Sequence, residues 1–437
     1  MNRIISVLAS LVCICIWFTG CNTSQSSVYE EFSYKNIDII QIKNDLSRNI
    51  VMSFYYKCGY DQEIYPEEAN WYITNIMLGS DTKKYSAKEI KTIMQENGIS
   101  ITSGYNQNYG SITSKFLLKD YDLASDLLKE LVFECSITDN AFKECQNNYL
   151  TQASKTLTSE KVLERIKNIY FGNEEQKSSN IDIKESSSQL ELSLDSLKKY
   201  YEQNIKRGKL SLVVAGNIPK SRILKTLKGI SLSQNKENEY ISEPPISQES
   251  KKVYFIAEGE KSIITLSKYE AVNSRDIIDL YFIRGLLEKR LNDNIRRKMG
   301  EAYIVNVSVE IGKPSTLIIR IVSNEPEVVG RTLKDELDRF EAKDISQQEL
   351  KIAYEKFITE FYLSLEKKER LATFLGSTHI LGLNFKELFS NPDEKVSIDP
   401  NNLNDIICEL KSNMCYFGVG NYSEVEKSRF EGVFEEK

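Results

Sequence analysis

The chain is poor in the side chains that bind catalytic metals. Its 437 residues include one histidine, His379. A hydrolytic zinc site needs several imidazole or carboxylate ligands and a base for the bound water, so a single histidine predicts that no such site forms. The chain also has no G-x-S-x-G, P-loop or G-x-G-x-x-G motif, and no spacing of Asp and Glu singles out an acid–base pair. We therefore predict no catalytic residue and no cofactor, and we expect His379 to be a packed helix histidine.

The cysteines point to targeting rather than to catalysis. Cys13 and Cys15 lie in the apolar run Ile4–Phe18, which follows Arg3 and is shorter than the roughly 20 residues of a membrane-spanning helix. The next cysteine, Cys21, ends a Phe-Thr-Gly-Cys sequence that resembles a bacterial lipobox, in which the cysteine is lipidated and the chain is cut before it. The five remaining cysteines form no C-x-x-C pair, and their odd number argues against a complete disulfide framework.

This N-terminal pattern predicts where the protein resides. We expect residues 1–20 to be a lipoprotein signal peptide and residues 21–29 to be a lipidated tether. The mature protein would then be an extracytoplasmic, membrane-anchored lipoprotein. An ordinary signal peptide that happens to contain Cys21, or an uncleaved anchor, is the alternative.

Composition and length describe a globular body of more than one domain. The formal net charge of −6 argues against nucleic-acid binding, and 437 residues exceed what one hydrophobic core usually supports. Residues 232–250 are polar and contain Pro244 and Pro245, which is typical of a linker. We therefore predict two domains, 30–231 and 251–437.

The two halves contain the same order of elements. Gly98 and Gly300 each precede a predicted strand, and Thr138 and Ser346 each cap a helix later in the same half. The corresponding positions lie roughly 200 residues apart, which indicates duplication of one unit of strands and helices. We expect each half to be a sheet covered by helices on one face. The predicted strands are 37–42, 50–56, 99–103, 111–118, 210–216, 302–310 and 316–322.

A family resemblance begins at the helix after the first two strands. Ala69–Ser80 aligns without gaps with the helix that carries the inverted zinc motif H-x-x-E-H in insulinase/pitrilysin-type metallopeptidases, which include the mitochondrial processing peptidases. The first zinc histidine falls on Asn70, the catalytic glutamate on Ile73 and the second histidine on Thr74. The third ligand, a glutamate on a later helix, falls on Gln152.

The resemblance implies a fold without the activity. Asn70 and Thr74 offer neutral oxygens that bind zinc weakly, and Ile73 cannot take a proton from water. The chain thus resembles an inactive member of the family. The implied fold is α/β of the α+β kind, in which two homologous repeats, each a mostly antiparallel sheet covered by helices, form a two-lobed clamshell.

Two further segments carry the resemblance. Gly98–Ser103 is similar to the family's edge strand, to which an extended peptide substrate adds. Ile295–Tyr303 matches the family pattern R-x-x-x-G-x-x-Y, whose arginine and tyrosine contact the substrate near the zinc. This match implies that Arg296 and Tyr303 bind substrate. The alternative is that Arg296 neutralises a nearby carboxylate and that Tyr303 fills the core. We expect Arg290 to have a structural role of this kind.

Three functions are compatible with this pattern. The chain could be a non-catalytic, peptide-binding subunit that pairs with a zinc-bearing homologue, which is the function we favour. It could instead act alone as a lipoprotein that binds peptides or unfolded polypeptides, or be an enzyme with other chemistry. A homologue with an H-x-x-E-H motif encoded nearby would favour the first function, bound peptide on the lone chain the second, and hydrolysis that resists chelators the third.

Overall fold

The fold is that of a computed structural model, which describes residues 29–43, 48–58, 66–106, 108–154, 159–171, 192–230, 253–257, 259–340, 347–384 and 399–435. The predicted signal peptide, Cys21 and the predicted linker 232–250 lie outside these residues. None of the described helices combines the length and the apolar composition of a membrane span.

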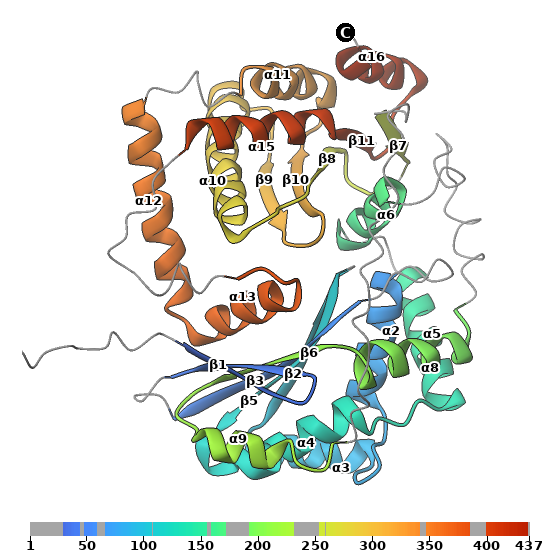
Figure 1. The fold of residues 1–437 in the computed structure, drawn as a ribbon. Coiled ribbons are helices and arrows are strands. Elements are labelled where there is room, and N and C mark those ends of the chain that lie inside the picture. The colour runs from blue at the N-terminus through green and yellow to red at the C-terminus, as the bar shows by residue number, and fades with distance from the viewer. Residues whose placement is uncertain are drawn as a thin grey trace, which may run out of the picture.

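Each half is built around one sheet, and the two sheets lie in separate lobes (Figure 1). The first sheet has the strand order β1-β2-β6-β3-β5-β4, and the second has the order β7-β11-β8-β10-β9. Only the β2–β6 and β7–β11 pairs are parallel among the described ladders. The strands are β1 (Tyr29–Tyr34), β2 (Ile37–Ile42), β3 (Asn49–Lys57), β4 (Ser100–Tyr105), β5 (Tyr109–Leu117), β6 (Leu210–Ala215), β7 (Val253–Ile256), β8 (Ser262–Tyr269), β9 (Ile304–Glu310), β10 (Ser315–Val322) and β11 (Cys415–Val419).

The helices follow the strands in the same order in both halves. The first half contains α2 (Pro66–Gly79), α3 (Ala87–Asn97), the turn η1 (Leu118–Asp120), α4 (Tyr121–Phe133), α5 (Asp139–Ser154), α6 (Ser159–Phe171), α8 (Leu194–Tyr201), the π-helical η3 (Glu202–Lys206) and α9 (Lys220–Thr226). The second contains α10 (Ser274–Leu291), the π-helical η4 (Asn292–Met299), α11 (Pro326–Asp338), α12 (Gln347–Leu365), α13 (Lys368–Ile380), α15 (Pro400–Ser412) and α16 (Glu424–Glu435).

The duplication inferred from the sequence is visible in the strand order. If β2, β6, β3, β5 and β4 are replaced by β7, β11, β8, β10 and β9, the first sheet becomes the second, with β1 as an extra edge strand. The predicted α+β fold of two homologous repeats in two lobes is therefore confirmed. The predicted strands end within two residues of the observed ones, whereas the sequence pattern did not single out β1, β7, β8 and β11.

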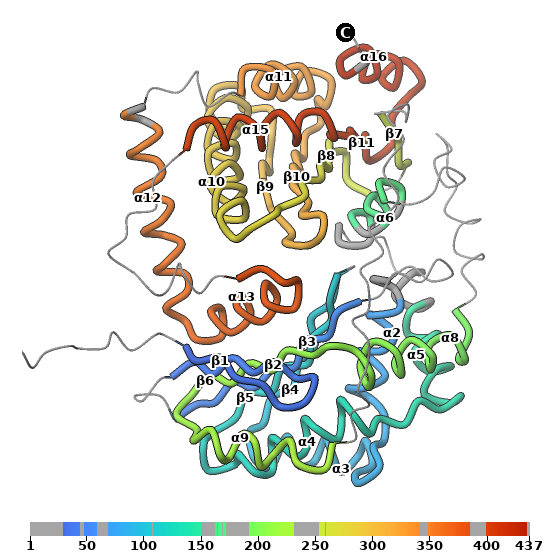
Figure 2. Tube along the Cα trace, in the orientation of Figure 1, coloured from blue at the N-terminus to red at the C-terminus, as the bar shows by residue number. Residues whose placement is uncertain are grey.

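The expectation that helices cover only one face of each sheet is wrong, because a helix from each half packs on the sheet of the other half. Helix α13 of the second half packs on β2, β3 and β6 of the first sheet, and α6 of the first half packs on the second sheet. In Figure 2 the green α6 accordingly lies with the yellow and red elements, and the orange α13 lies on the blue strands. Both faces of each sheet are thereby buried.

Strand β3 shows how the sequence provides apolar side chains for both buried faces of the sheet. Its even-numbered residues, such as Met52 and Phe54, face the helices of the first half, whereas Val51 and Tyr55 face α13. Gly376 of α13 allows this contact, because a Cβ atom there would lie 2.2 Å from the Tyr55 ring. A strand that is buried on both faces reads as a continuous apolar run, as this one does.

Helix boundaries follow from capping side chains. Ser86 and Glu89 form a capping box at the start of α3, and Gly98 ends that helix with a φ of 62°. Asn273 and Asp276 form the equivalent box at the start of α10. Thr138, predicted as a cap, accepts a hydrogen bond from the Ala141 N–H at 3.2 Å. The other predicted cap, Ser346, lies outside the described residues.

Candidate functional site: a closed polar cluster and an exposed binding face

Helix α2 carries the positions of the family's zinc motif into the interior. Asn70, Ile73 and Thr74 are each 0 % exposed. They lie on the side of α2 that packs against β4, α5 and α8, within the core of the first lobe. Any polar group at these positions must be satisfied by other protein groups, because water does not reach them.

Asn70 is the centre of a hydrogen-bonded cluster, which we define as Asn70, Cys58, Asn106 and Tyr200. Its Nδ2 group donates to the Asn106 carbonyl at 2.8 Å and to the Cys58 sulfur, and its Oδ1 accepts from the Tyr200 hydroxyl at 2.9 Å. Burial raises the pKa of Tyr200 well above its ordinary value, so this hydroxyl remains a neutral donor. The cluster ties α2 to α8 and to the end of β4.

Thr74 and Ile73 are used by the fold itself. The Thr74 hydroxyl donates to the carbonyls of Asn70 at 2.7 Å and Trp71 at 3.1 Å, one turn earlier on the same helix. Ile73 contributes to the hydrophobic core. Neither side chain presents a lone pair to a shared point in space, as a metal ligand would.

The later helix does not complete a metal site with them. Gln152 lies on α5, and its side chain is outside what the structure describes. Cys145, the cysteine on that helix, has a pKa raised to about 11 by burial, so it is a thiol rather than a thiolate. No group of His, Cys, Asp and Glu that could hold a metal occurs among the described residues. These side chains therefore do not fit the zinc ion that the family resemblance implies.

The second half presents Arg296 and Tyr303 on the surface. Tyr303 is 63 % exposed, and its hydroxyl accepts a hydrogen bond from Asn324 at 2.9 Å, so it does not fill the core. Arg296 is exposed on η4 and makes no ion pair with any described residue. Tyr303 therefore does not have the core role of the structural alternative, and the described residues offer Arg296 no carboxylate partner. Arg290 pairs with Glu336 at 3.5 Å, as expected of a structural arginine.

The fold keeps this pair away from the Asn70 cluster. Tyr303 precedes β9, and the hairpin at the far end of β9 contacts the first lobe, where the Lys313 N–H donates to the Asn108 side chain at 3.1 Å. Asn108 is two residues from Asn106 of the cluster. The seven residues of β9 span roughly 20 Å. The sequence-predicted residues thus lie in two separate regions of the molecule.

The edge strands of the two sheets differ. In the first sheet β4 lies at the edge, as predicted for Gly98–Ser103. In the second sheet the outer edge of β9 is occupied by side chains of the α10–η4 helix. Arg284 Nε donates to the Val307 carbonyl at 2.6 Å, and Glu288 accepts from the Val307 N–H at 3.3 Å. An extended peptide could add to β4 but not to β9.

His379 and the cysteines are structural groups. His379 lies on α13, where its Nδ1 is 2.8 Å from the Ser211 hydroxyl of β6, and burial lowers its pKa. The expectation of a packed helix histidine is confirmed. No disulfide bond, including the conceivable one between Cys408 and Cys415, joins the cysteines that the structure describes.

The partners of Asn70 are residues that sequence reasoning missed. Tyr200 is 130 positions from Asn70, and nothing in its neighbourhood marks it as polar core. Cys58 stands at the end of β3, directly before the zinc-helix resemblance, but a single cysteine gave no signal. Only the three-dimensional pairing of α2 with α8 identifies these groups.

Comparison with known proteins shows which family the chain resembles. Residues 191–357 match the family described as the peptidase M16 inactive domain. A Helicobacter pylori protein named "Non-peptidase homolog YmxG" is 25 % identical over 353 residues, which cover 76 % of this chain and 79 % of the relative. The chain is thus similar to inactive members of the insulinase-type (M16) peptidase family.

Solved structures agree with this similarity in fold. A structure described as a protease from Helicobacter pylori has a TM-score of 0.74 at 14 % identity, covering 90 % of this chain and 99 % of that one. The first half of the periplasmic protease PqqL from Escherichia coli has a TM-score of 0.68 at 12 % identity, covering 94 % and 97 %. Both likenesses concern the two-lobed fold.

Proposed function

We propose that this insulinase-type homologue is a non-catalytic subunit that binds peptide and pairs with a zinc-bearing homologue. In this proposal the first lobe is a scaffold, and the second lobe offers Arg296 and Tyr303 to a substrate held by the partner. Cys21 carries a lipid that keeps the assembly at an extracytoplasmic membrane surface.

The exposure of Arg296 and Tyr303 supports this proposal most strongly. Both side chains point to solvent at a distance of about one strand, roughly 20 Å, from the lobe that contains Asn70. They do not lie close enough to α2 to complete a site with it, and neither side chain belongs to a hydrophobic core of the described residues. A ligand bound by a second chain would give both residues a role.

The chemistry of the pair suits a peptide bond. The Arg296 guanidinium offers several donors to a carbonyl oxygen, and the Tyr303 hydroxyl can donate to the same group as negative charge develops there. The zinc-bearing partner would supply the metal and its water. This chain would bind and orient the substrate.

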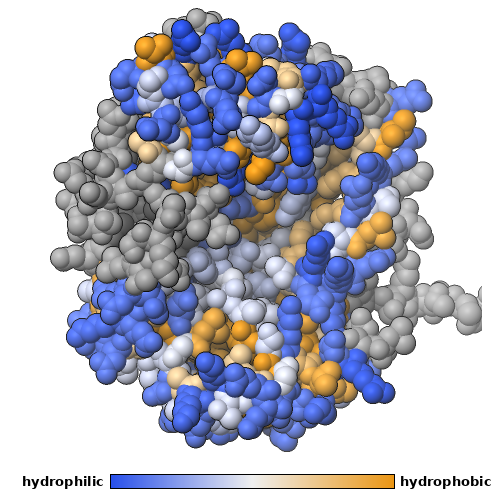
Figure 3. Space-filling model, turned by 180° about the vertical axis from the view of Figure 1, so that it is seen from behind, coloured by the Kyte–Doolittle hydropathy of each residue, from blue (hydrophilic) through white to orange (hydrophobic). Residues whose placement is uncertain are grey.

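A second candidate is a peptide-binding lipoprotein that acts alone. The surface is hollowed between the two lobes (Figure 3), and β4 offers an edge to which an extended chain could add. A small cavity of about 200 Å³ lies beside this edge. It is lined in part by Ser103, Gly104 and Tyr109. Such a site would bind peptide without a partner.

The deciding experiment is isolation of the full-length, tagged chain from its native membrane. We expect a homologue with an H-x-x-E-H motif to accompany it, with chelator-sensitive peptidase activity and zinc in the partner only. One zinc per chain on the purified protein alone would overturn the proposal. Bound peptide without a homologue would favour the second candidate, and hydrolysis that resists chelators would indicate other chemistry.

Lipid attachment is tested separately. Metabolic labelling with a radioactive fatty acid should label the wild-type chain and fail to label Cys21→Ser. Equal labelling of both proteins, or none of either, would remove the lipid anchor from the proposal without affecting the rest of it.

A further inference from the structure

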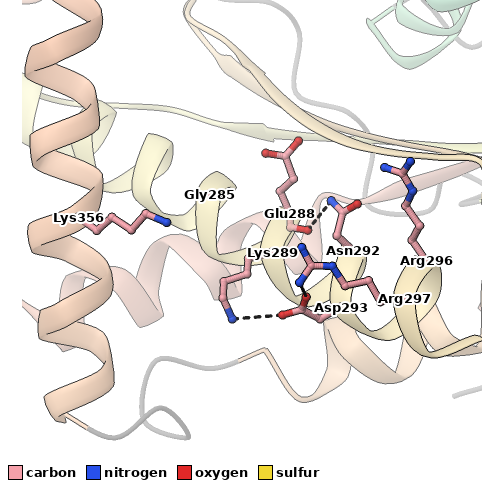
Figure 4. A pocket seen from close by; sticks show the side chains of 8 residues that line it. All are labelled: Gly285, Glu288, Lys289, Asn292, Asp293, Arg296, Arg297 and Lys356. Carbon is pink, nitrogen blue, oxygen red and sulfur yellow. Dashed lines mark hydrogen bonds and ion pairs between the residues drawn. The ribbon is translucent and has the colours of Figure 1, made fainter.

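A cavity with a basic lining lies where α10 and η4 face α12. Its volume is about 730 Å³, within the usual range of ligand-binding pockets. Figure 4 shows the side chains that surround it. The lining residues are Gly285, Glu288, Lys289, Asn292, Asp293, Arg296, Arg297 and Lys356.

Both acidic residues of the lining already have cationic partners. Asp293 accepts from Lys289 at 3.2 Å and pairs with Arg297 at 2.8 Å, and these contacts keep its pKa below the ordinary value. Glu288 pairs with Arg284 at 3.0 Å and also accepts from a backbone N–H of β9. Their negative charges are therefore not available to neutralise the other cations.

Of the cations that line the cavity, Arg296 has no ion-pair partner among the described residues, and Lys356 has only a weak one. In Figure 4 the Arg296 guanidinium stands apart from the group around Asp293, and Lys356 reaches from α12 toward Gly285. The contact of Lys356 with Glu360 is 3.7 Å long between two exposed side chains, so it contributes little. The cavity thus carries a net positive charge that an anion would complement.

Gly285 is the second unusual feature. It lies within the 18-residue helix α10, where glycine costs about 1 kcal/mol relative to alanine. A Cβ atom built at this position meets no heavy atom within 4 Å, so no neighbour requires a glycine there. The missing side chain leaves the wall of the cavity open opposite Lys356.

We infer that this cavity binds a peptide, with a carboxylate of the peptide on Arg296 and the adjoining residues of the peptide on the open surface at Gly285, beside Lys356. The carboxylate could be the C-terminus of the peptide or an acidic side chain, since both present the same two oxygens to a guanidinium. The inference rests on the proposed function, in which Arg296 binds the substrate, and adds the chemical group that it binds. It concerns binding by this chain alone and does not require a partner.

The test is fluorescence anisotropy with the purified chain and three dye-labelled short peptides of Gly, Ser and Ala. The first has a free C-terminal carboxylate, the second has an amidated C-terminus, and the third is amidated but contains glutamates. We expect the first or the third to bind, depending on the source of the carboxylate, and the amidated peptide without acid to bind at least about tenfold more weakly. Equal binding of all three peptides, or of none, would overturn the inference.

Substitutions locate the binding. Arg296→Ala should weaken binding of the carboxylate peptide about tenfold, the usual order for a lost hydrogen bond to a charged group. Lys298→Ala is the matched control, because Lys298 is an exposed cation of the same η4 segment that bonds Asn294 and does not line the cavity. Equal effects of the two substitutions would mean that the peptide is bound by general charge attraction, which would overturn the inference.

Gly285→Trp tests the cavity itself, because the indole would occupy the open space. Binding of the carboxylate peptide should then be lost. If Gly285→Trp proves unfolded by circular dichroism, the comparison of Arg296→Ala with Lys298→Ala decides alone. Isolation of the chain without a zinc-bearing homologue would contradict the proposed function but would leave these binding results unchanged, so the two failures are distinguishable.

Discussion

The Asn70 cluster of the first lobe and the basic cavity of the second differ in the hydrogen-bond and ion-pair partners of their polar groups. Every polar atom of the Asn70 side chain is bonded to protein, and the residue is fully buried. Arg296 has no ion-pair partner among the described residues and is exposed. The folded chain satisfies every polar atom of the Asn70 side chain, whereas the Arg296 guanidinium is left to water or to a ligand.

This difference follows from burial. The positions of the zinc motif are buried in this chain but hold no metal ligands. The interior must still pair each polar group, so neutral side chains at these positions have to satisfy one another. Surface binding residues are under no such demand. Stability should therefore depend on the first region, and ligand binding on the second.

The largest effect on stability is expected at Asn70. Asn70→Ala removes the acceptor of the Tyr200 hydroxyl and leaves a buried cavity, so it should destabilise the protein by about 2–4 kcal/mol. Urea unfolding measures this loss. Asn75→Ala on the same helix is the control and should cost about 1 kcal/mol or less, since Asn75 is only half-buried and bonds one carbonyl of its own helix. Similar losses for both would mean that the cluster is not special.

Two helix glycines provide the next comparison. Gly376→Ala should destabilise the protein by about 1–3 kcal/mol, because the new Cβ would meet the Tyr55 ring where α13 packs on the first sheet. Gly285→Ala should instead stabilise it by up to about 1 kcal/mol, because α10 gains helix propensity without a clash. Thermal unfolding of the two variants should shift in opposite directions. Shifts of the same sign would contradict the packing described for one of the two helices.

Arg296→Ala should separate stability from function. The free energy of unfolding should change by less than about 0.5 kcal/mol, because the side chain is exposed. In a reconstituted pair with a zinc-bearing homologue, peptidase activity should fall about tenfold while assembly is spared. Unchanged activity would return Arg296 to a role on the protein surface only.

The smallest expected effect is the pH dependence that His379 contributes. Burial lowers its pKa in the folded chain, although Asp38 and Glu31 oppose this shift, and Lys209 adds to it. The unfolded chain therefore binds a proton at a higher pH than the folded chain does. This contribution to stability is present above a pH of about 6.5 and is lost as the pH falls toward the folded pKa. The free energy of unfolding should fall less for His379→Asn than for the wild type over this acidic range. Parallel curves of unfolding free energy against pH would contradict the prediction.

The sequence allowed the fold to be predicted because the information was local or repeated. Strand patterns and caps such as Thr138 follow from neighbouring residues, and the duplication is apparent from Gly98 and Gly300. The degenerate zinc motif was equally readable, since one histidine cannot supply two.

The remaining features depend on distant contacts. The exchange of α6 and α13 gives no local signal, because an apolar strand buried by its own helices looks the same as one buried by a borrowed helix. The bond between Tyr200 and Asn70 joins residues whose proximity depends on the whole first lobe. The exposure of Tyr303 could not be inferred either, since tyrosine is as common in cores as at binding surfaces.

The exchanged helices make each lobe incomplete without the other. Either half produced as a separate fragment would leave the sheet face that its neighbour normally covers open to water, and should aggregate or remain partly folded. A single proteolytic cut between α9 and β7 should have a milder effect. The two pieces would stay joined through α6, α13 and contacts such as the 2.8 Å ion pair of Lys167 with Glu310, and would separate only in denaturant.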